Sequence, residues 1–192
     1  MTVHSGMTDP FQQALHTAAV GNAALAALAV FCANVLLFVL TLALAAVAFF
    51  NRQRLTWELA ARVAASLAVA VLLTLLLGRT VLDPRPYLAE HYAPLAHVAS
   101  DNGFPSDHTL VAALLACWVW WLDRRLLPLF VAGLTLVTAG RLAIGAHHSL
   151  DVLGSVAFAL IGFAVASWLP LPAGWNSRRL FPGRAGRDTG RP

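Results

Sequence analysis

Two histidines and one aspartate have the types and the spacing that phosphate transfer requires. His147 and Asp151 are four residues apart, so on a helix their side chains would lie on the same face. The carboxylate could then bind one ring nitrogen and fix the tautomer, which leaves the other nitrogen free to attack phosphorus. His108 would act as the general acid for the departing oxygen and then as the base for water. The pattern predicts three catalytic residues and a phosphohistidine intermediate.

Cationic residues near these three predict a pocket for a phosphate group. Arg79, Arg85 and Arg141 each offer a planar fork of donors that binds phosphate oxygens in a bidentate manner. Ser106 stands where a helix should begin, and a serine there caps the free N–H groups of the first turn. The same helix start can also receive a phosphate. Both roles of Ser106 stay open at this point.

Competing explanations for the histidines are less specific. Adjacent His147 and His148 could indicate a metal, but neighbours on a helix diverge by about 100° and no Cys or Glu accompanies them at ligand spacing. We therefore expect no metal and no cofactor. His148 is expected to face lipid headgroups or solvent, and His91 and His97 to be surface residues without a role.

Membrane-spanning helices must position these residues. The chain has 192 residues, of which 59% are hydrophobic and 11% charged, and its mean hydropathy of +0.71 is far above that of a soluble domain. A bilayer is crossed by about 20 apolar helical residues. The sequence predicts an all-α integral membrane protein, a bundle of about five transmembrane helices, or six if the first apolar run is broken around Asn34. The five runs cover residues 22–50, 57–78, 108–122, 126–145 and 150–169.

The sequence also gives expectations for the two ends of the chain and for the division into domains. Residues 9–20 are predicted to form an N-terminal helix at the membrane surface. Residues 1–170 are expected to form one membrane domain. Residues 171–192 are rich in Arg, Pro and Gly and are expected to be disordered, since such a segment buries little apolar surface. Cys32 and Cys117 lie within apolar runs, and we expect no disulfide.

The arginines predict which side each loop faces. Loops enriched in basic residues stay cytoplasmic, and most arginines fall after the first run, after the third run and in the C-terminal tail: Arg52, Arg54, Arg124, Arg125, Arg178, Arg179, Arg184, Arg187 and Arg191. The C-terminus is then cytoplasmic and residues 79–107 are outside. Only Arg79, Arg85 and Arg141 oppose this rule, and as ligands of an anion they have another reason to be there.

In order and spacing, these motifs resemble the type 2 phosphatidic acid phosphatase superfamily of membrane lipid phosphatases. Its signature runs Lys-x6-Arg-Pro, then Pro-Ser-Gly-His, then Ser-Arg-x5-His-x3-Asp. Here Pro105–His108 differs from the second part only at Asp107, and residues 141–151 match the third part except for Gly140 before Arg141. Arg85 and Pro86 keep the end of the first part. The Lys position would be Gly78, and the nearest cation is Arg79.

The resemblance implies a role for each matching residue. His147 would be the nucleophile, Asp151 its orienting partner, and His108 the acid and base, with phosphate bound by a second set: Arg85, Ser106, Arg141, Arg79 and Asp107. Pro-Ser-Asp-His resembles the bacitracin-resistance type of undecaprenyl-pyrophosphate phosphatase, which acts without metal. That branch implies a multi-pass protein of the bacterial cytoplasmic membrane with its site on the extracytoplasmic face.

The expected activity is hydrolysis of undecaprenyl pyrophosphate, which recycles the cell-wall lipid carrier. The partners would be a polyprenyl pyrophosphate or another phospholipid and the bilayer, with no nucleic acid. One alternative is a broader lipid phosphatase that acts on phosphatidylglycerol phosphate or phosphatidate. Another is a non-catalytic lipid-binding protein or transporter, although binding alone requires neither His108 nor the pairing of His147 with Asp151.

Overall fold

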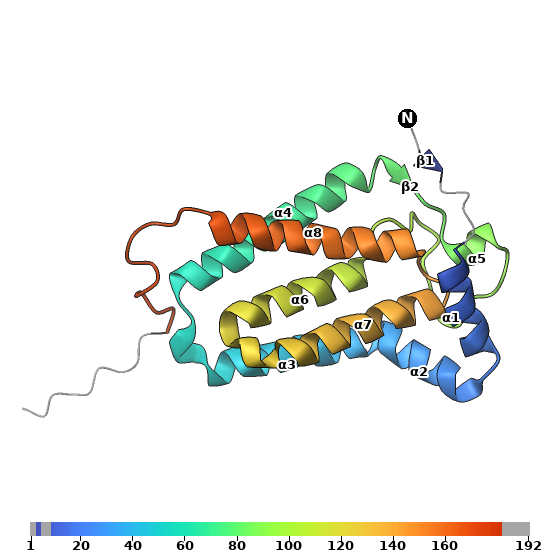
Figure 1. Cartoon of the computed structure of the whole chain (residues 1–192), viewed down its shortest axis with the longest axis horizontal. Coiled ribbons are helices and arrows are strands. Elements are labelled where there is room, and N and C mark those ends of the chain that lie inside the picture. The colour runs from blue at the N-terminus through green and yellow to red at the C-terminus, as the bar shows by residue number, and fades with distance from the viewer. Residues whose placement is uncertain (1–2, 5–8, 182–192) are drawn as a thin grey trace, which may run out of the picture.

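The computed structural model describes residues 3–4 and 9–181, and Figure 1 shows a bundle of helices. The helices are α1 (Pro10–Val20), α2 (Ala23–Asn34), α3 (Leu36–Phe50), α4 (Trp57–Leu77), α5 (Pro86–Ala89), α6 (Asp107–Asp123), α7 (Leu127–Ala143) and α8 (Ser149–Trp168). Two 3-10 turns, η1 (Arg52–Arg54) and η2 (Arg124–Leu126), join helices. The two-residue strands β1 (Val3–His4) and β2 (Val81–Leu82) pair in parallel. The predicted all-α class is confirmed.

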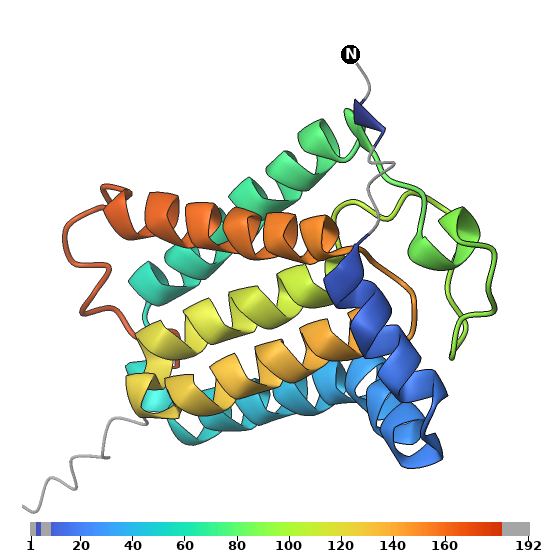
Figure 2. The same cartoon turned by 45° about the vertical axis from the view of Figure 1, so that its right-hand side comes forward.

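Several helices are long and apolar enough to cross a membrane. Among the described residues, three helical stretches meet this test, or four if the bent pair α2–α3 counts as one span. The longest, Asp107–Ala143, contains both α6 and α7, which lie side by side because the chain turns at η2 (Figures 1 and 2). Each of these two helices has 17 residues, the lower end of the range of about 17 to 25 for a span. The number of crossings stays a prediction.

The first apolar run is a bent pair rather than one straight helix. Helices α2 and α3 meet at an angle of 47°. Helix α2 begins where the Asn22 side chain accepts hydrogen bonds from the backbone N–H groups of Ala24 and Leu25, which satisfies two free donors of the first turn. It ends at Asn34, the polar residue at which the sequence allowed a break.

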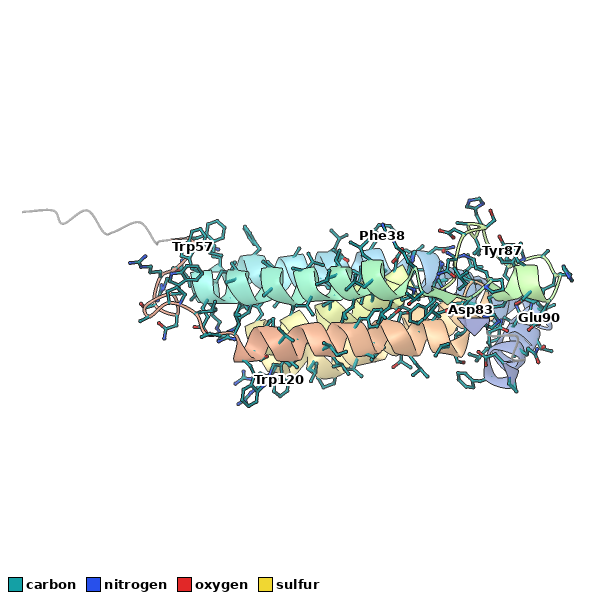
Figure 3. All side chains as sticks on the ribbon, turned by 90° about the horizontal axis from the view of Figure 1, so that it is seen from above. Phe38, Trp57, Asp83, Tyr87, Glu90 and Trp120 are labelled. Atoms are coloured by element: carbon teal, nitrogen blue, oxygen red, sulfur yellow. The ribbon has the colours of Figure 1, made fainter. Side chains whose placement is uncertain are left out.

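Large apolar side chains cover the outside of the bundle. Phe38, Leu42 and Leu153 are 67%, 70% and 65% exposed, and a water-soluble monomer rarely exposes so much contiguous apolar surface. In Figure 3, Trp57 and Trp120 lie toward one end of the bundle, whereas Asp83, Tyr87 and Glu90 lie at the other. This distribution suits a bilayer around the middle of the bundle, with polar loops at both ends.

Helix α6 is central and packs against α3, α7 and α8, while α4 packs mainly along α8. The contact between α4 and α8 is close because Gly162 has no side chain. A Cβ atom at Gly162 would lie 2.5 Å from the Ser66 carbonyl oxygen. Small residues allow this approach in membranes, where backbone proximity replaces the hydrophobic effect between helices.

The predicted N-terminal helix is present as α1 and is fixed to the polar end of the bundle. Gln12 is fully buried and donates to the Tyr92 hydroxyl and the Leu142 carbonyl, both at 3.1 Å. The His16 ring stacks on Tyr92 and its Nδ1 lies 2.8 Å from the Ala143 carbonyl oxygen. Asp9 caps α1 and also accepts from the backbone N–H and the hydroxyl of Ser149. Helix α1 therefore holds the end of α7 and the start of α8.

The first part of the C-terminal tail has defined contacts. The Leu180 N–H donates to the Leu55 carbonyl, and the Arg178 carbonyl accepts from the Trp57 N–H, at 2.8 and 3.1 Å. Residues 171–181 thus lie against the start of α4, and the expected disorder does not describe them. Residues 182–192 lie outside the described part of the chain. Nearby, Arg62 pairs with Glu58 and donates to two carbonyls at the end of α8.

Candidate active site

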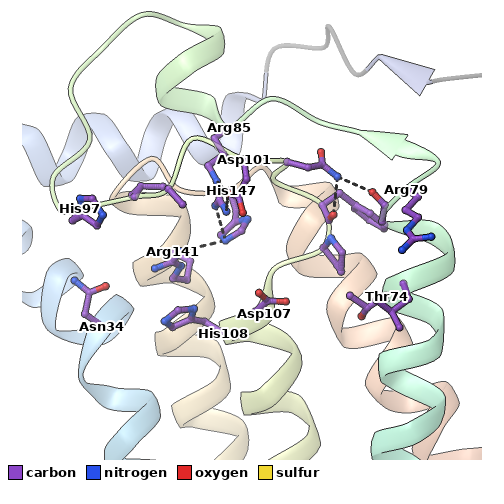
Figure 4. A pocket seen from close by; sticks show the side chains of 17 residues that line it. Asn34, Thr74, Arg79, Arg85, His97, Asp101, Asp107, His108, Arg141 and His147 are labelled. Atoms are coloured by element: carbon purple, nitrogen blue, oxygen red, sulfur yellow. Dashed lines mark hydrogen bonds and ion pairs between the residues drawn. The ribbon is translucent and has the colours of Figure 1, made fainter.

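A cavity of about 490 Å³ opens at the polar end of the bundle, between the ends of α2, α4, α6 and α7 (Figure 4). Six of the eight predicted site residues line it. These are Arg79, Arg85, Asp107, His108 and Arg141, and His147 joins them from the turn before α8. The residues come from segments up to 68 positions apart, and the fold gathers them as the sequence predicted.

His147 is almost completely buried, and its two ring nitrogens have different surroundings. Nδ1 lies 2.9 Å from the Gly103 carbonyl oxygen and 3.4 Å from Asp151 Oδ2. A carbonyl oxygen can only accept, so Nδ1 carries the proton and Nε2 keeps its lone pair. The predicted pairing of His147 with Asp151 is present, but the shorter contact is to the main chain of Gly103.

Two arginines face the free Nε2 atom. Arg85 Nη1 and Arg141 Nη2 each lie 3.3 Å from His147 Nε2, as the dashed lines in Figure 4 indicate. Arg85 is itself fixed, since Nη1 donates to the Ala146 carbonyl and the opposite edge of its fork donates to Asp101 Oδ1 at 2.7 and 3.1 Å. Two guanidinium groups beside one nitrogen would hold an anionic phosphoryl group within reach of that nitrogen.

Burial keeps the imidazole of His147 neutral. Burial first, and then the positive charges of Arg141 and Arg85, hold the pKa of His147 well below 6.5. A neutral imidazole is the form that attacks phosphorus. The same arginines that would bind phosphate therefore also keep the nitrogen in its nucleophilic state.

Local backbone geometry differs from the helical turn expected for residues 147–151. Helix α8 begins at Ser149, so His147 precedes it and His148 is its N-cap with extended φ and ψ of −84° and 165°. Asp151 is the third residue of the helix, and its Oδ2 accepts from the His148 backbone N–H at 2.9 Å. This hydrogen bond holds the Asp151 carboxylate beside the turn, where its Oδ2 lies 3.4 Å from His147 Nδ1.

The expectation that His148 faces headgroups or solvent is wrong. His148 is 7% exposed, and its Nδ1 lies 3.0 Å from Asp83 Oδ2. The angular rule for neighbours on a helix does not apply, because His148 lies in the turn and not in the helix. Burial acts to lower the pKa of His148, but the hydrogen bond to Asp83 and the nearby carboxylates outweigh it, and that pKa is raised.

Asp83, His148 and Asp151 offer three ligand atoms within 4.8 Å of one another, a spacing that could hold a metal ion. His148 Nδ1 already contacts Asp83, and Asp151 Oδ2 already accepts from the His148 main chain. These contacts already occupy ligand atoms of all three residues.

The other predicted site residues take different places. His108 and Asp107 point into the cavity from the start of α6 (Figure 4). Arg79 is exposed at the cavity edge. Ser106 holds the N-cap position of α6 but makes no capping bond, is fully buried and lies outside the cavity lining, with no hydrogen-bond partner for its hydroxyl. Its role as a phosphate ligand stays a prediction.

Residues to which the sequence assigned no role also shape the site. Gly103 supplies the carbonyl that fixes the tautomer, Asp101 holds Arg85, and Asp83 holds His148. His97, expected to be a surface residue without a role, is exposed and lines the cavity. The Asp-Pro-Arg-Pro order placed Asp83 beside a predicted ligand, and that adjacency was the available signal.

Fold and site together define a helical membrane protein with a histidine and arginine pocket suited to a phosphate group. Residues 59–175 match the sequence model of the PAP2 superfamily, which is more than half of the chain, and the chain belongs to that superfamily. The predicted resemblance to type 2 phosphatidic acid phosphatases is confirmed.

Curated relatives point to a branch of this superfamily. The chain is 36% identical over 98 residues to "Undecaprenyl-diphosphatase BcrC" of Bacillus subtilis strain 168, covering 50% of this chain and 48% of the relative. It is 30% identical over 110 residues to "Putative undecaprenyl-diphosphatase YbjG" of Escherichia coli strain K12, covering 55% of this chain and 54% of the relative. The matched region thus spans about half the length of these relatives. No solved structure matches the chain significantly.

Proposed function

We propose that this protein hydrolyses undecaprenyl pyrophosphate to undecaprenyl phosphate and inorganic phosphate through a phosphate bound covalently to His147. The observation that carries the proposal is the unprotonated Nε2 of a buried histidine, placed 3.3 Å from each of two guanidinium groups. The names of the two curated relatives support the substrate. The membership of this chain in the PAP2 superfamily supports a phosphatase.

The first step forms a bond between His147 Nε2 and the terminal phosphorus. The bond from that phosphorus to the bridging oxygen breaks, and the lipid monophosphate leaves with a proton from His108. Arg85 and Arg141 neutralise the negative charge on the phosphoryl oxygens during the transfer. Throughout, the proton stays on Nδ1 of His147, which donates a hydrogen bond to the Gly103 carbonyl oxygen and lies 3.4 Å from Asp151 Oδ2. These two oxygens offset the positive charge that grows on the ring.

The second step regenerates the histidine. His108, now neutral, accepts a proton from water, and the water oxygen attacks phosphorus while the bond from phosphorus to Nε2 breaks. Inorganic phosphate leaves and His147 recovers its lone pair. This mechanism uses the residues of the chain alone, and we propose that it needs no metal.

The orientation of the arginine-rich loops supports a site on the extracytoplasmic face of the bacterial cytoplasmic membrane, with the C-terminus inside. A lipid pyrophosphate released on the outer side would then reach the cavity directly from the outer leaflet. This placement fits a role in recycling the lipid carrier of cell-wall synthesis.

Phosphate release by the purified full chain in detergent tests the proposal. Undecaprenyl pyrophosphate should be hydrolysed in the presence of EDTA, and His147→Ala should abolish the activity. His91→Asn is the matched control, because His91 is exposed and has a positive φ of 58° that asparagine tolerates. Full activity of His147→Ala would refute the mechanism, and loss of wild-type activity in EDTA would refute metal independence.

A panel of lipids tests the substrate separately. Undecaprenyl pyrophosphate should be preferred over phosphatidylglycerol phosphate and phosphatidate, and a preference for either monophosphate would identify a broader lipid phosphatase. Rapid quenching in base should trap acid-labile phosphate on the wild-type chain and none on His147→Ala. If none of these lipids gives phosphate release or trapped phosphate, a non-catalytic binding role would replace the proposal.

A further inference from the structure

A second layer of charged residues lies directly behind the nucleophile. Asp83, His148 and Asp151 are 1%, 7% and 0% exposed, and they come from three segments: the loop after β2, the turn before α8, and the first turn of α8. None of the three lines the cavity, so none would touch a substrate there.

His148 connects the two carboxylates. Its ring Nδ1 lies 3.0 Å from Asp83 Oδ2, and its backbone N–H donates to Asp151 Oδ2 at 2.9 Å. The same Asp151 oxygen lies 3.4 Å from Nδ1 of His147. One residue therefore links Asp83 to the carboxylate that orients the nucleophile.

Asp83 and Asp151 also share a side-chain hydrogen bond, which needs one proton between the two carboxyl groups. The pair then keeps one negative charge, which a cation at His148 neutralises. Buried carboxylates side by side are costly unless a positive group accompanies them. The ligand atoms of Asp83, His148 and Asp151 all lie within 4.8 Å of one another. Asp9, bonded to the neighbouring Ser149, adds a third carboxylate on the side of α1. Arg85 and Arg141 are directed instead at His147 Nε2.

We propose that His148 is a positively charged positioning residue, which offsets the carboxylates of Asp83 and Asp151 and so holds Asp151 against the nucleophile His147. The inference rests on the proposed catalytic role of His147. It assigns two further residues to the reaction, Asp83 and His148, which act through Asp151 and not on the substrate. The raised pKa of His148 agrees with it: burial opposes the charge, but Asp83, Asp151 and Asp9 together outweigh burial.

Neutral substitutions separate charge from shape. His148→Asn keeps a donor near the position of Nδ1 but removes the positive charge. It should lower kcat about 10- to 100-fold with little change in KM, the size of effect expected when a group that orients an active-site residue is removed. Asp83→Asn removes one of the two opposing carboxylates. The double variant His148→Asn with Asp83→Asn should therefore recover much of the kcat that His148→Asn loses, because the two effects are coupled.

The kinetic outcomes decide between charge and packing. His148→Asn with wild-type kcat would overturn the proposal, and so would a double variant whose loss equals the product of the two single losses. A change in KM with unchanged kcat would also contradict it, since His148 does not reach the cavity. His91→Asn, an exposed histidine of the same outer loop region, should leave both constants unchanged.

A measurement without substrate keeps this inference separate from the proposed function. In NMR titrations of the detergent-solubilised chain labelled at histidine, the His148 signal should titrate above 6.5 and should move to lower pH in Asp83→Asn. A His148 signal that is already neutral at pH 6 would overturn the inference, even in an active enzyme. A chain that hydrolyses no lipid phosphate but shows the raised titration would refute the proposed function and retain the charged His148.

Discussion

The tautomer of His147 depends on a main-chain atom of Gly103. The carbonyl oxygen lies 2.9 Å from Nδ1 and can only accept a hydrogen bond, so it fixes the ring proton on Nδ1. The position also requires glycine. A Cβ atom there would lie 2.9 Å from the Asp83 carbonyl oxygen and 3.0 Å from Asp151 Oδ2, closer than ordinary contacts.

Gly103→Ala should therefore impair both alignment and stability. The added methyl group must displace Asp151 or the 83–84 backbone, so we expect a loss of kcat of at least about 10-fold and a destabilisation of about 1 to 3 kcal/mol, as for overpacking elsewhere. Phosphate release and thermal unfolding in detergent measure the two effects. Gly21→Ala, at the exposed end of α1 and outside the cavity lining, is the control. A Gly103→Ala enzyme with unchanged kcat would contradict the role of the carbonyl.

The pH dependence of the reaction should reflect the environment of His147. Because burial, Arg141 and Arg85 hold its pKa well below 6.5, the ring is already neutral at pH 6.5, and kcat/KM should not fall through the ordinary histidine range as the pH is lowered. Arg85→Gln removes one positive charge and should shift the acid limb of the profile toward higher pH, in addition to weakening binding. If the acid limb of the kcat/KM profile does not shift in Arg85→Gln, that limb belongs to a group other than His147.

The sequence predicts the site residues that belong to a recognisable motif. It does not predict the main-chain groups and distant side chains that contact them. His147, Asp151 and Arg141 share one short segment with a recognisable spacing. The Gly103 carbonyl has no sequence signature, because every residue carries one. The contact between Asp83 and His148 spans 65 positions, and only the assembled fold brings these two residues together.

At the scale of the element, apolar runs predicted the helices closely. Runs expected at 108–122, 126–145 and 150–169 are Asp107–Asp123, Leu127–Ala143 and Ser149–Trp168. The precise start of α8 was the consequential difference. Beginning the helix at Ser149 leaves the two histidines in an extended turn, which buries His148 and turns His147 toward Gly103. The helical spacing of His147 and Asp151 assumed a helix that includes residue 147, two residues before the observed start of α8, and this difference changed the predicted role of His148.

Close packing of α8 on α4 depends on Gly162, and a larger residue at this position should push the two helices apart. Gly162→Val would place side-chain atoms against the Ser66 carbonyl, where even a Cβ comes within 2.5 Å. We expect a lower melting temperature and a destabilisation of about 1 to 3 kcal/mol. Ala164→Val, on the exposed side of the same helix, adds the same apolar bulk without a neighbour and should melt like the wild type. Equal melting of the two variants would argue against a tight contact.

At the scale of the whole molecule, the two ends of the bundle differ in chemistry. The cavity end carries Arg85, Arg141 and the outer loop, and the opposite end carries Trp57, Trp120 and the arginine-rich turns. The proposed orientation places the cavity outside the cell.

Cysteine labelling of intact cells tests that orientation. Ser100→Cys, exposed in the outer loop, should react with an impermeant maleimide, whereas Ser177→Cys at the other end should react only after permeabilisation. Cys32 and Cys117 are buried and should add little background. The reverse labelling pattern would invert the topology, and with it the leaflet from which the substrate comes.

The attachment of α1 has a practical consequence for handling this protein. Through Asp9, Gln12 and His16, the N-terminal helix forms hydrogen bonds with Ser149, Leu142 and Ala143, which flank the turn that contains His147 and His148. Shortening the chain past Asp9 would therefore strip hydrogen bonds from that turn, however remote the N-terminus looks in the sequence. An affinity tag belongs after the C-terminal tail, since residues 171–181 lie at the end of the bundle away from the cavity (Figure 1).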